Sequence, residues 1–280
     1  MALEGVDVSH NNGRVNWSRV RRAGISFAYI KATEGVTFAD PACSTNLAGC
    51  RAAGVAPGLY HFYHHDADVQ LQAAHFLRVV GKPQAGDLPP ALDVEAPGDG
   101  SGSVAYPAAD VVRRLGEFVQ TVERAIGRAP AIYTYPSAWR ELTANSSVFA
   151  DTCPLWIASY ATTPTLVGGW SDYTFWQYAD HGAVDGIPTN VDRDRLHGDD
   201  SMLDALRDRS LAVGGMALLN QDGNVRTAPG LGGHVIKALT KGTGVVIVDG
   251  PRLVKDREWW KVDDGEGTVG WSSSKVLSTA

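Results

Sequence analysis

Two acidic residues, Asp93 and Glu95, lie within an otherwise apolar stretch at residues 91–96. Side chains two positions apart on a β-strand point to the same side, so a strand here would place the two carboxyl groups close together. Neighbouring carboxylates resist joint ionisation, which raises the pKa of one of them and keeps a general acid protonated near neutral pH. The same Asp-x-Glu spacing recurs at residues 256–258 and 264–266, but there among charged residues and glycine, a setting typical of solvated surface. The first copy is therefore the candidate for catalysis.

The elements that would position this pair are short strands alternating with segments of helical period, which indicates β/α units. Apolar residues from Val111 to Ile126 recur at helical spacing and end near Gly127, so a core-facing helix is expected there. The predicted strands are residues 5–9, 27–31, 57–63, 91–95, 131–135, 155–160, 174–178 and a short one near 191. About eight strands over about 200 residues suit a small (β/α) barrel, although the last three strands leave little room for helices.

A barrel of this kind gathers the carboxyl ends of its strands around one cleft, where catalytic groups are expected. Besides the first acid pair, the candidates on or after these strands are the acids Asp7, Asp192 and Asp194. Four further residues are candidate substrate contacts: Lys31, Glu34, His61 and Tyr63. Aromatic residues on the later strands have flat faces suited to sugar rings; they are Tyr133, Tyr135, Trp156, Tyr160, Trp176 and Tyr178, with Trp156 and Trp176 preferred. Several carboxyl groups and few cations in one cleft suit cleavage of a glycosidic bond.

Each candidate also has a purely structural interpretation. The acid pair could be satisfied by backbone groups, the aromatic residues could belong to the core, and Lys31 with Glu34 could form an ion pair within the barrel. His61, His64 and His65 have no second ligand set at metal-binding spacing, so neither a metal nor a cofactor is expected.

The composition limits the class of protein. With 280 residues, 44% hydrophobic content and a net charge of −6, the chain can bury a large core and offers no electrostatic case for nucleic-acid binding. It has no apolar run of about 20 residues that could span a bilayer, and its start lacks the pattern of a signal peptide. No heptad pattern is present, so we expect a monomer.

The three cysteines carry little functional signal. They are odd in number and lack metal-ligand spacing. Cys43 and Cys50 fall in an expected helix, where seven residues span about 10 Å, too far for a disulfide. With Cys153, they are expected to act mainly as small buried apolar residues.

Taken in order, these motifs resemble the lysozymes of glycoside hydrolase family 25, the Chalaropsis-type muramidases. The matching pieces are residues 5–9, 27–35, 58–62, 92–95, 132–134, 155–158, 176–178 and 190–192. The resemblance implies an α/β fold with an irregular, TIM-like (β/α)5(β)3 barrel. It also implies cleavage of the β-1,4 bond between N-acetylmuramic acid and N-acetylglucosamine in bacterial peptidoglycan.

The resemblance further implies roles for particular residues. Glu95 matches the general acid and Asp93 its carboxylate partner, while Asp7 and Asp192 match the other catalytic acids. Asp194 ranks lower because the family varies at that position. The Asp-x-Glu pair is similar to that of enzymes in which the substrate's own N-acetyl group attacks the anomeric carbon with net retention; an inverting reaction would instead need a base such as Asp7 or Asp192.

The sequence pattern changes after about residue 212, where short strands closely separated by turn residues predict a small all-β barrel. Residues 224–229, 259–262 and 270–272 resemble a bacterial Src-homology-3-type domain, a module of cell-wall enzymes. We therefore expect a catalytic barrel at residues 1–211 and a wall-binding module at residues 212–280. The protein is expected to act on the cell wall from outside the cell, either as a phage endolysin or as a chain whose leader has been removed. A chitin-type glycosidase and a non-catalytic wall-binding protein remain the alternatives.

Overall fold

The computed structural model describes residues 2–96, 106–207, 211, 213–255 and 257–279. The chain divides into two compact units. The first runs to Arg207, and the second begins at Asp208 and also takes in the short stretch Gln84–Gly86. Each unit is described by itself.

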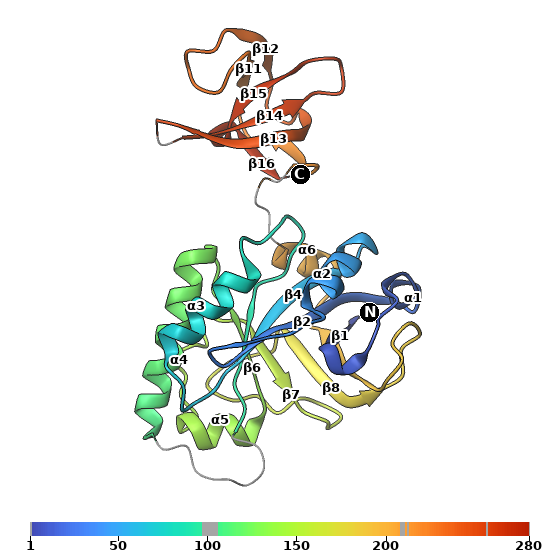
Figure 1. Ribbon diagram of the computed structural model, residues 1–280, viewed down its shortest axis with the longest axis vertical. Coiled ribbons are helices and arrows are strands. Elements are labelled where there is room, and N and C mark those ends of the chain that lie inside the picture. Colours follow the sequence, from blue (N-terminus) through green and yellow to red (C-terminus); the bar gives the residue numbers. More distant parts are fainter. Residues whose placement is uncertain (1, 97–105, 208–210, 212, 256, 280) are drawn as a thin grey trace. The chain divides into compact units, whose positions relative to one another are not determined.

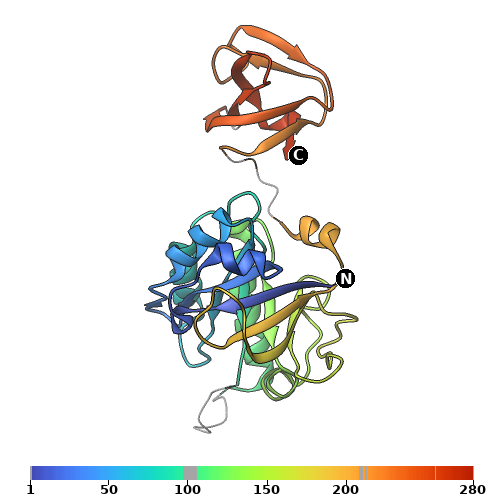
Figure 2. The same ribbon diagram turned by 90° about the vertical axis from the view of Figure 1, so that its right-hand side faces the viewer.

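The first unit is built on a closed sheet in which β1 pairs with both β9 and β2 (Figures 1 and 2). In order around the sheet, the strands are β1 (Leu3–Val8), β9 (Val191–Leu196), β8 (Phe175–Gly182), β7 (Leu155–Ala158), β6 (Ala131–Thr134), β5 (Ala91–Asp93), β4 (Ala56–Phe62), β2 (Ile25–Glu34) and the short β3 (Phe38–Ala39). The barrel neighbours are parallel except at β9, which runs antiparallel to both β1 and β8. The predicted mixed barrel is confirmed.

Helices follow the first five barrel strands. They are α1 (Trp17–Arg22), α2 (Cys43–Ala52), α3 (Val69–Val80), α4 (Ala108–Ile126) and α5 (Pro136–Thr143), with a one-turn η1 (His10–Asn12) after β1 and a final α6 (Asp200–Leu206) after β9. The segments 159–174 and 183–190, which join the last three strands, contain no helix. Five strand–helix units followed by three strands without helices between them agree with the predicted (β/α)5(β)3 pattern.

The helix α4 illustrates how local sequence builds the outer layer. Val111, Leu115, Phe118 and Val122 recur every three to four residues and are almost fully buried against the barrel. The helix ends where Gly127 adopts φ 82°, a left-handed conformation that costs little only for glycine.

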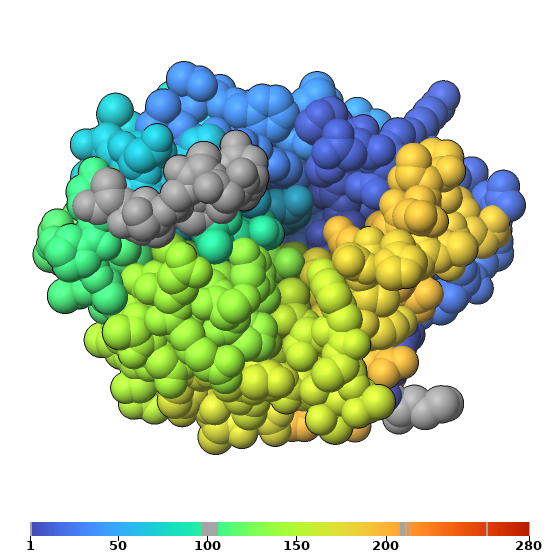
Figure 3. All heavy atoms as spheres, turned by 90° about the horizontal axis from the view of Figure 1, so that it is seen from below, coloured from blue at the N-terminus to red at the C-terminus, as the bar shows by residue number. Residues whose placement is uncertain are grey.

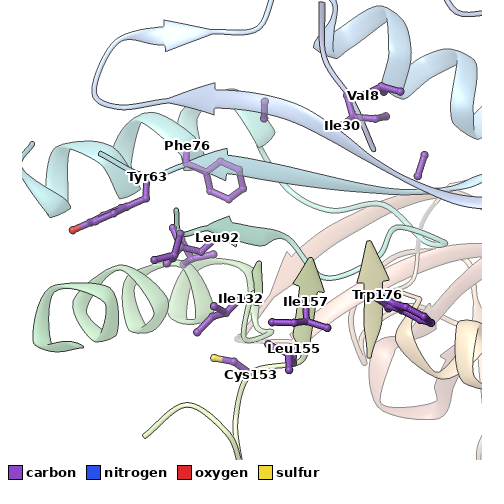
Figure 4. Close-up of a cluster of buried hydrophobic side chains, with 14 of the residues drawn as sticks. Val8, Ile30, Tyr63, Phe76, Leu92, Ile132, Cys153, Leu155, Ile157 and Trp176 are labelled. Carbon is purple, nitrogen blue, oxygen red and sulfur yellow. The ribbon is translucent and has the colours of Figure 1, made fainter. Parts of the chain in front are cut away.

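Strand alternation separates two apolar layers. Leu92, Ile132 and Ile157 point outward and pack between the strands and the helices (Figure 4). Their neighbours along the chain, among them Tyr133 and Trp156, point inward and fill the barrel interior. The side of the strand on which a residue falls therefore decides whether it can reach the barrel mouth.

The cysteines behave as small buried residues. Cys43, Cys50 and Cys153 are free thiols with at most 6% of their surface exposed. Burial raises the pKa of Cys43 and of Cys153 to about 11, which keeps both thiols protonated at neutral pH. This confirms the expectation for them.

The second unit is an antiparallel β-structure with its own core, and its described residues contain no α-helix. Its strands are β10 (Met216–Leu219), β11 (Gly223–Arg226), β12 (Val235–Leu239), β13 (Gly244–Val254), β14 (Arg257–Asp263), β15 (Val269–Ser273) and β16 (Leu277–Thr279), with a one-turn η3 (Ser274–Val276) before β16. Val225, Ile247, Trp260 and Val262 lie in its core. In neither unit is a described helix long and apolar enough to cross a membrane.

Candidate active site

A cleft of about 680 Å³ lies at the mouth of the barrel, where most strands end (Figure 3). Its acidic residues are Asp7, Asp93, Glu95 and Asp192, and its aromatic residues are Tyr60, Phe62, Tyr133, Tyr135, Trp156 and Tyr160. A second groove of about 830 Å³, between α1 and α2, contains no carboxyl group in its lining. The mouth of the barrel is therefore the cleft equipped for acid–base chemistry.

The end of β5 positions the acid pair. Backbone hydrogen bonds continue past the strand: Tyr63 donates its N–H to the Asp93 carbonyl at 3.0 Å, and Val94 donates to the Tyr133 carbonyl at 2.9 Å. These bonds keep the chain extended, so Asp93 and Glu95 both point into the barrel, as their spacing predicts.

The pair is built to hold a proton. The two carboxyl groups lie close enough to share a hydrogen bond, which requires a proton on one of them. Burial and the neighbouring Glu95 raise the pKa of Asp93 well above its ordinary value, and burial also raises the pKa of Glu95. The ammonium group of Lys31 opposes both shifts. One proton thus stays within the pair at neutral pH, and Glu95, the less buried partner, faces the cleft.

Two further residues fix the backbone beyond Glu95. The His65 Nε2–H donates to the Glu95 carbonyl at 2.8 Å, and the Ala96 N–H donates to the Tyr135 hydroxyl at 3.2 Å. Burial lowers the pKa of His65, so its imidazole is neutral and one ring nitrogen carries the donated hydrogen. Motif analysis did not single out His65 for this contact, because the bond depends on β4 lying beside β5.

Closure of the barrel brings the other acids together. In the β1–β9 register, Asp7 lies opposite Asp192 and Gly5 lies opposite Asp194, so the three carboxyl groups share the inner face. Asp7 and Asp192 line the cleft, whereas Asp194 is 0% exposed and lies beneath it. Burial raises the pKa of Asp192 to about 6 and that of Asp194 to about 8; burial with these two neighbours raises the pKa of Asp7 well above its ordinary value.

Gln177 connects this acid group to the aromatic residues. Its Nε2 donates to Asp7 Oδ2 at 2.8 Å, and its Oε1 accepts hydrogen bonds from the hydroxyls of Tyr133 (3.0 Å) and Tyr160 (2.9 Å). Gln177 is not among the site residues predicted from the sequence. Its inward position follows from alternation on β8, once Phe175 is seen to face the barrel interior.

Lys31 and Glu34 form the ion pair considered for them, and of the two only Lys31 lines the cleft. Lys31 Nζ lies 2.6 Å from Glu34 Oε2 and 4.8 Å from the centre of the Phe62 ring, and Lys31 lines the cleft. Glu34 does not line the cleft; it holds Lys31 and also lies 3.0 Å from His64 Nε2. The ion pair is thus present, and it presents the ammonium group to the cleft.

Three of the expected sugar contacts are core residues instead. His61 is 0% exposed, stacks on Phe118 and lies within hydrogen-bond distance of Thr33. Tyr63 is 3% exposed and packs edge-on against the same Phe118 ring (the tyrosine is labelled in Figure 4). Trp176 is 7% exposed, and its Nε1–H donates to the Ser159 carbonyl at 2.7 Å.

The expectation that these three side chains touch substrate is therefore corrected, and strand alternation is the reason. On β4 the inward residues are Tyr60 and Phe62, which turns His61 toward the helices. On β8 the inward residues flank Trp176 on both sides. Among the residues that the structure describes, no three His, Cys, Asp or Glu side chains are placed to share a metal ion.

Comparison with known proteins places this geometry in a family. The model of glycosyl hydrolases family 25 matches residues 6–187, and that of the bacterial SH3 domain matches residues 221–278. Lysozyme M1 of Streptomyces globisporus is 35% identical over 210 residues, covering 73% of this chain and 71% of the relative. The N,O-diacetylmuramidase of Chalaropsis sp. is 34% identical over 66% of this chain and 91% of the relative.

A crystal structure of the bacterial lysozyme from Streptomyces coelicolor agrees with the fold. It superposes with a TM-score of 0.71 at 34% identity, covering 74% of this chain and 97% of that one. The family match at residues 6–187 includes Asp7, Asp93 and Glu95, and Asp192 on β9 lies just beyond it. The chain therefore belongs to glycoside hydrolase family 25 and carries a bacterial SH3 domain after its catalytic barrel.

Proposed function

We propose that this glycosidase is a lysozyme that hydrolyses the β-1,4 bond between N-acetylmuramic acid and N-acetylglucosamine in bacterial peptidoglycan. The observation that carries the proposal is the buried, proton-sharing Asp93–Glu95 pair at the mouth of the barrel. Relatives named as a lysozyme and as an N,O-diacetylmuramidase support the choice of substrate. The protein thus acts on the cell wall.

Glu95 is the general acid in this proposal. It lines the cleft, and burial keeps its pKa raised, so it can give its proton to the oxygen of the departing sugar. Asp93 is more deeply buried, at 6% exposure, and retains hydrogen-bond contact with Glu95. Positive charge that develops at the anomeric carbon is stabilised by Asp192, on the opposite side of the mouth, with Asp7 beside it.

The adjacent carboxyl groups suit a reaction assisted by the substrate. In this scheme Asp93 accepts the N–H of the substrate's acetamido group, whose oxygen attacks the anomeric carbon while Glu95 protonates the leaving oxygen. Water then opens the ring intermediate with net retention. Proton NMR of the first-formed reducing sugar tests this, because retention gives the β-anomer; the α-anomer would require a water-activating base, Asp7 or Asp192.

Aromatic and polar side chains of the cleft would hold the sugars. Tyr160 is 56% exposed and keeps its hydroxyl on Gln177, so its ring can present a face to a sugar while its tip stays anchored. Trp156 and Tyr133 also line the cleft but are nearly buried, and they shape its floor. Lys31 offers a hydrogen-bond donor beside the acid pair.

The SH3 domain is proposed to hold the enzyme on the wall, which raises the local concentration of the polymer at the cleft. We place this module at residues 212–280 and the catalytic barrel at residues 1–211, acting as a monomer without nucleic acid. A chain ending at residue 211 should keep its activity on short soluble glycans and lose binding to intact walls in a sedimentation assay. Equal sedimentation of the two chains would refute the tethering role.

The activity itself is tested by digesting purified peptidoglycan with the full chain and with Glu95→Gln, followed by reduction of the new ends and mass spectrometry. New reducing ends at muramic acid that disappear in the variant support the proposal. Faster release from chitin oligomers than from peptidoglycan would favour a chitin-type glycosidase instead. Wall binding without release of any sugar by the wild type would favour a non-catalytic wall-binding protein.

A further inference from the structure

Asp194 is a buried acid that no step of the proposed reaction uses. It lies on β9 with 0% exposure, on the inner face beneath Asp192. Its Oδ1 accepts the indole N–H of Trp156 at 2.8 Å. Its Oδ2 is shielded from solvent, and no N–H or hydroxyl group of the described residues donates to it.

A neighbour of Asp194 on this inner face is another acid. The carboxyl groups of Asp194 and Asp7 are close enough to share a hydrogen bond, as are those of Asp7 and Asp192. Ionised carboxylates only accept hydrogen bonds, so each contact in this row requires a proton on one of its two members. The row runs from the interior toward the cleft, because Asp194 is fully buried, Asp7 is 8% exposed and Asp192 is more exposed than either.

The positive charge of Arg193 lowers the pKa of Asp194 only in part, because Arg193 is paired elsewhere. Arg193, its neighbour on β9, forms an ion pair with Glu4 at 2.8 Å, and no described Lys, Arg or His side chain forms an ion pair with Asp194. From β2, the buried Tyr29 adds a neutral phenol nearby. An isolated carboxylate in such a site is strongly destabilised, and burial correspondingly raises the pKa of Asp194 to about 8.

We propose that Asp194 is a positioning residue that holds a proton at neutral pH and shares a hydrogen bond with Asp7. The inference rests on the proposed function, since it assigns a support to an acid of that site. Asp194 fixes the carboxyl group of Asp7 from beneath, and Gln177 holds it from the side through Oδ2. Through Oδ1, Asp194 also fixes the Trp156 ring, which stacks on the Tyr29 ring with 4.4 Å between the ring centres. Negative charge in the row is thereby left to Asp192, at the cleft surface.

A matched pair of substitutions separates a protonated from an ionised Asp194. Asp194→Asn preserves the shape and the bonding of a protonated acid, because the amide oxygen can accept from Trp156 and the amide N–H can donate to Asp7. Asp194→Leu fills the site without either bond. We expect Asp194→Asn to retain kcat on peptidoglycan within about threefold of wild type, and Asp194→Leu to lose between about 10- and 100-fold in kcat with a smaller change in KM.

A direct measurement keeps the inference testable if Asp194→Leu fails to fold. In the full chain with carboxyl-¹³C aspartate, NMR at pH 6.5 should show a neutral carboxyl resonance that is absent from Asp194→Asn. If the carboxyl resonance that disappears in Asp194→Asn has the chemical shift of an ionised carboxylate, the proposal is overturned. So would an Asp194→Asn variant that folds normally and loses as much kcat as Asp194→Leu.

Failure of the proposed function would look different. If the wild type releases no reducing ends, or if Glu95→Gln stays fully active, then the site assignment fails. The carboxyl resonance would still report whether Asp194 holds its proton.

Discussion

The protonated state of Asp194 should appear in the pH dependence of stability. The folded state holds this proton up to about pH 8, whereas in the unfolded chain the same group loses it near its ordinary pKa of 3.8. Between these values the unfolded state binds fewer protons, so the free energy of unfolding falls as pH rises from about 4 to about 8. At 1.36 kcal/mol for each unit of pKa, the loss from this group is about 4–6 kcal/mol. That is a large share of the total stability of an ordinary domain, about 5–15 kcal/mol.

Asp194→Asn removes this contribution, because an amide does not titrate. Relative to wild type, the variant should therefore gain about 4–6 kcal/mol of stability as pH is raised from 4 to 8. Denaturant unfolding of both full chains, followed by tryptophan fluorescence at several pH values, measures the difference. Leu203→Ala, which trims a buried side chain on α6, is the control and should show an offset from wild type that hardly varies with pH. A pH-independent difference between Asp194→Asn and wild type would refute the reasoning, because it would mean that Asp194 is ionised in the folded state.

Other predictions concern the acid, the cleft and the core. Glu95→Gln should lower kcat by about 10²- to 10⁴-fold with little change in KM, as measured by the release of reducing ends; a fall of less than tenfold would contradict its role as general acid. Tyr160→Ala should raise KM severalfold through loss of about 0.5–1.5 kcal/mol of ring contact, whereas Trp176→Phe, in the core, should lower the unfolding midpoint and leave KM unchanged; the reverse pattern would restore Trp176 as a sugar contact. Leu115→Ala should cost about 2–5 kcal/mol in denaturant unfolding, and a cost under 1 kcal/mol would mean that α4 is not packed as described.

Much of the framework is readable from local sequence. Apolar runs locate all eight barrel strands to within a few residues, and the spacing from Val111 to Ile126 locates α4 together with its stop at Gly127. The Asp93–Glu95 spacing alone predicts two carboxyl groups on one face, since the two-residue period of a strand is a local property. These features depend on short stretches of backbone, which is why they can be predicted without contacts distant in sequence.

What the tertiary structure decided is which side of each strand faces the barrel interior. Alternation is certain from sequence, but its phase depends on how the sheet closes; the interpretation of His61, Tyr63 and Trp176 as sugar contacts was wrong for this reason. Closure also sets Asp7 beside Asp192, residues 185 positions apart, and leaves Asp194 sealed beneath them. The protonation proposed for that row follows from burial and from the lack of a paired cation among the described residues, and neither is a property of the acids themselves. Sequence determined which acids are present, and the packing of the closed barrel determined which of them carry protons.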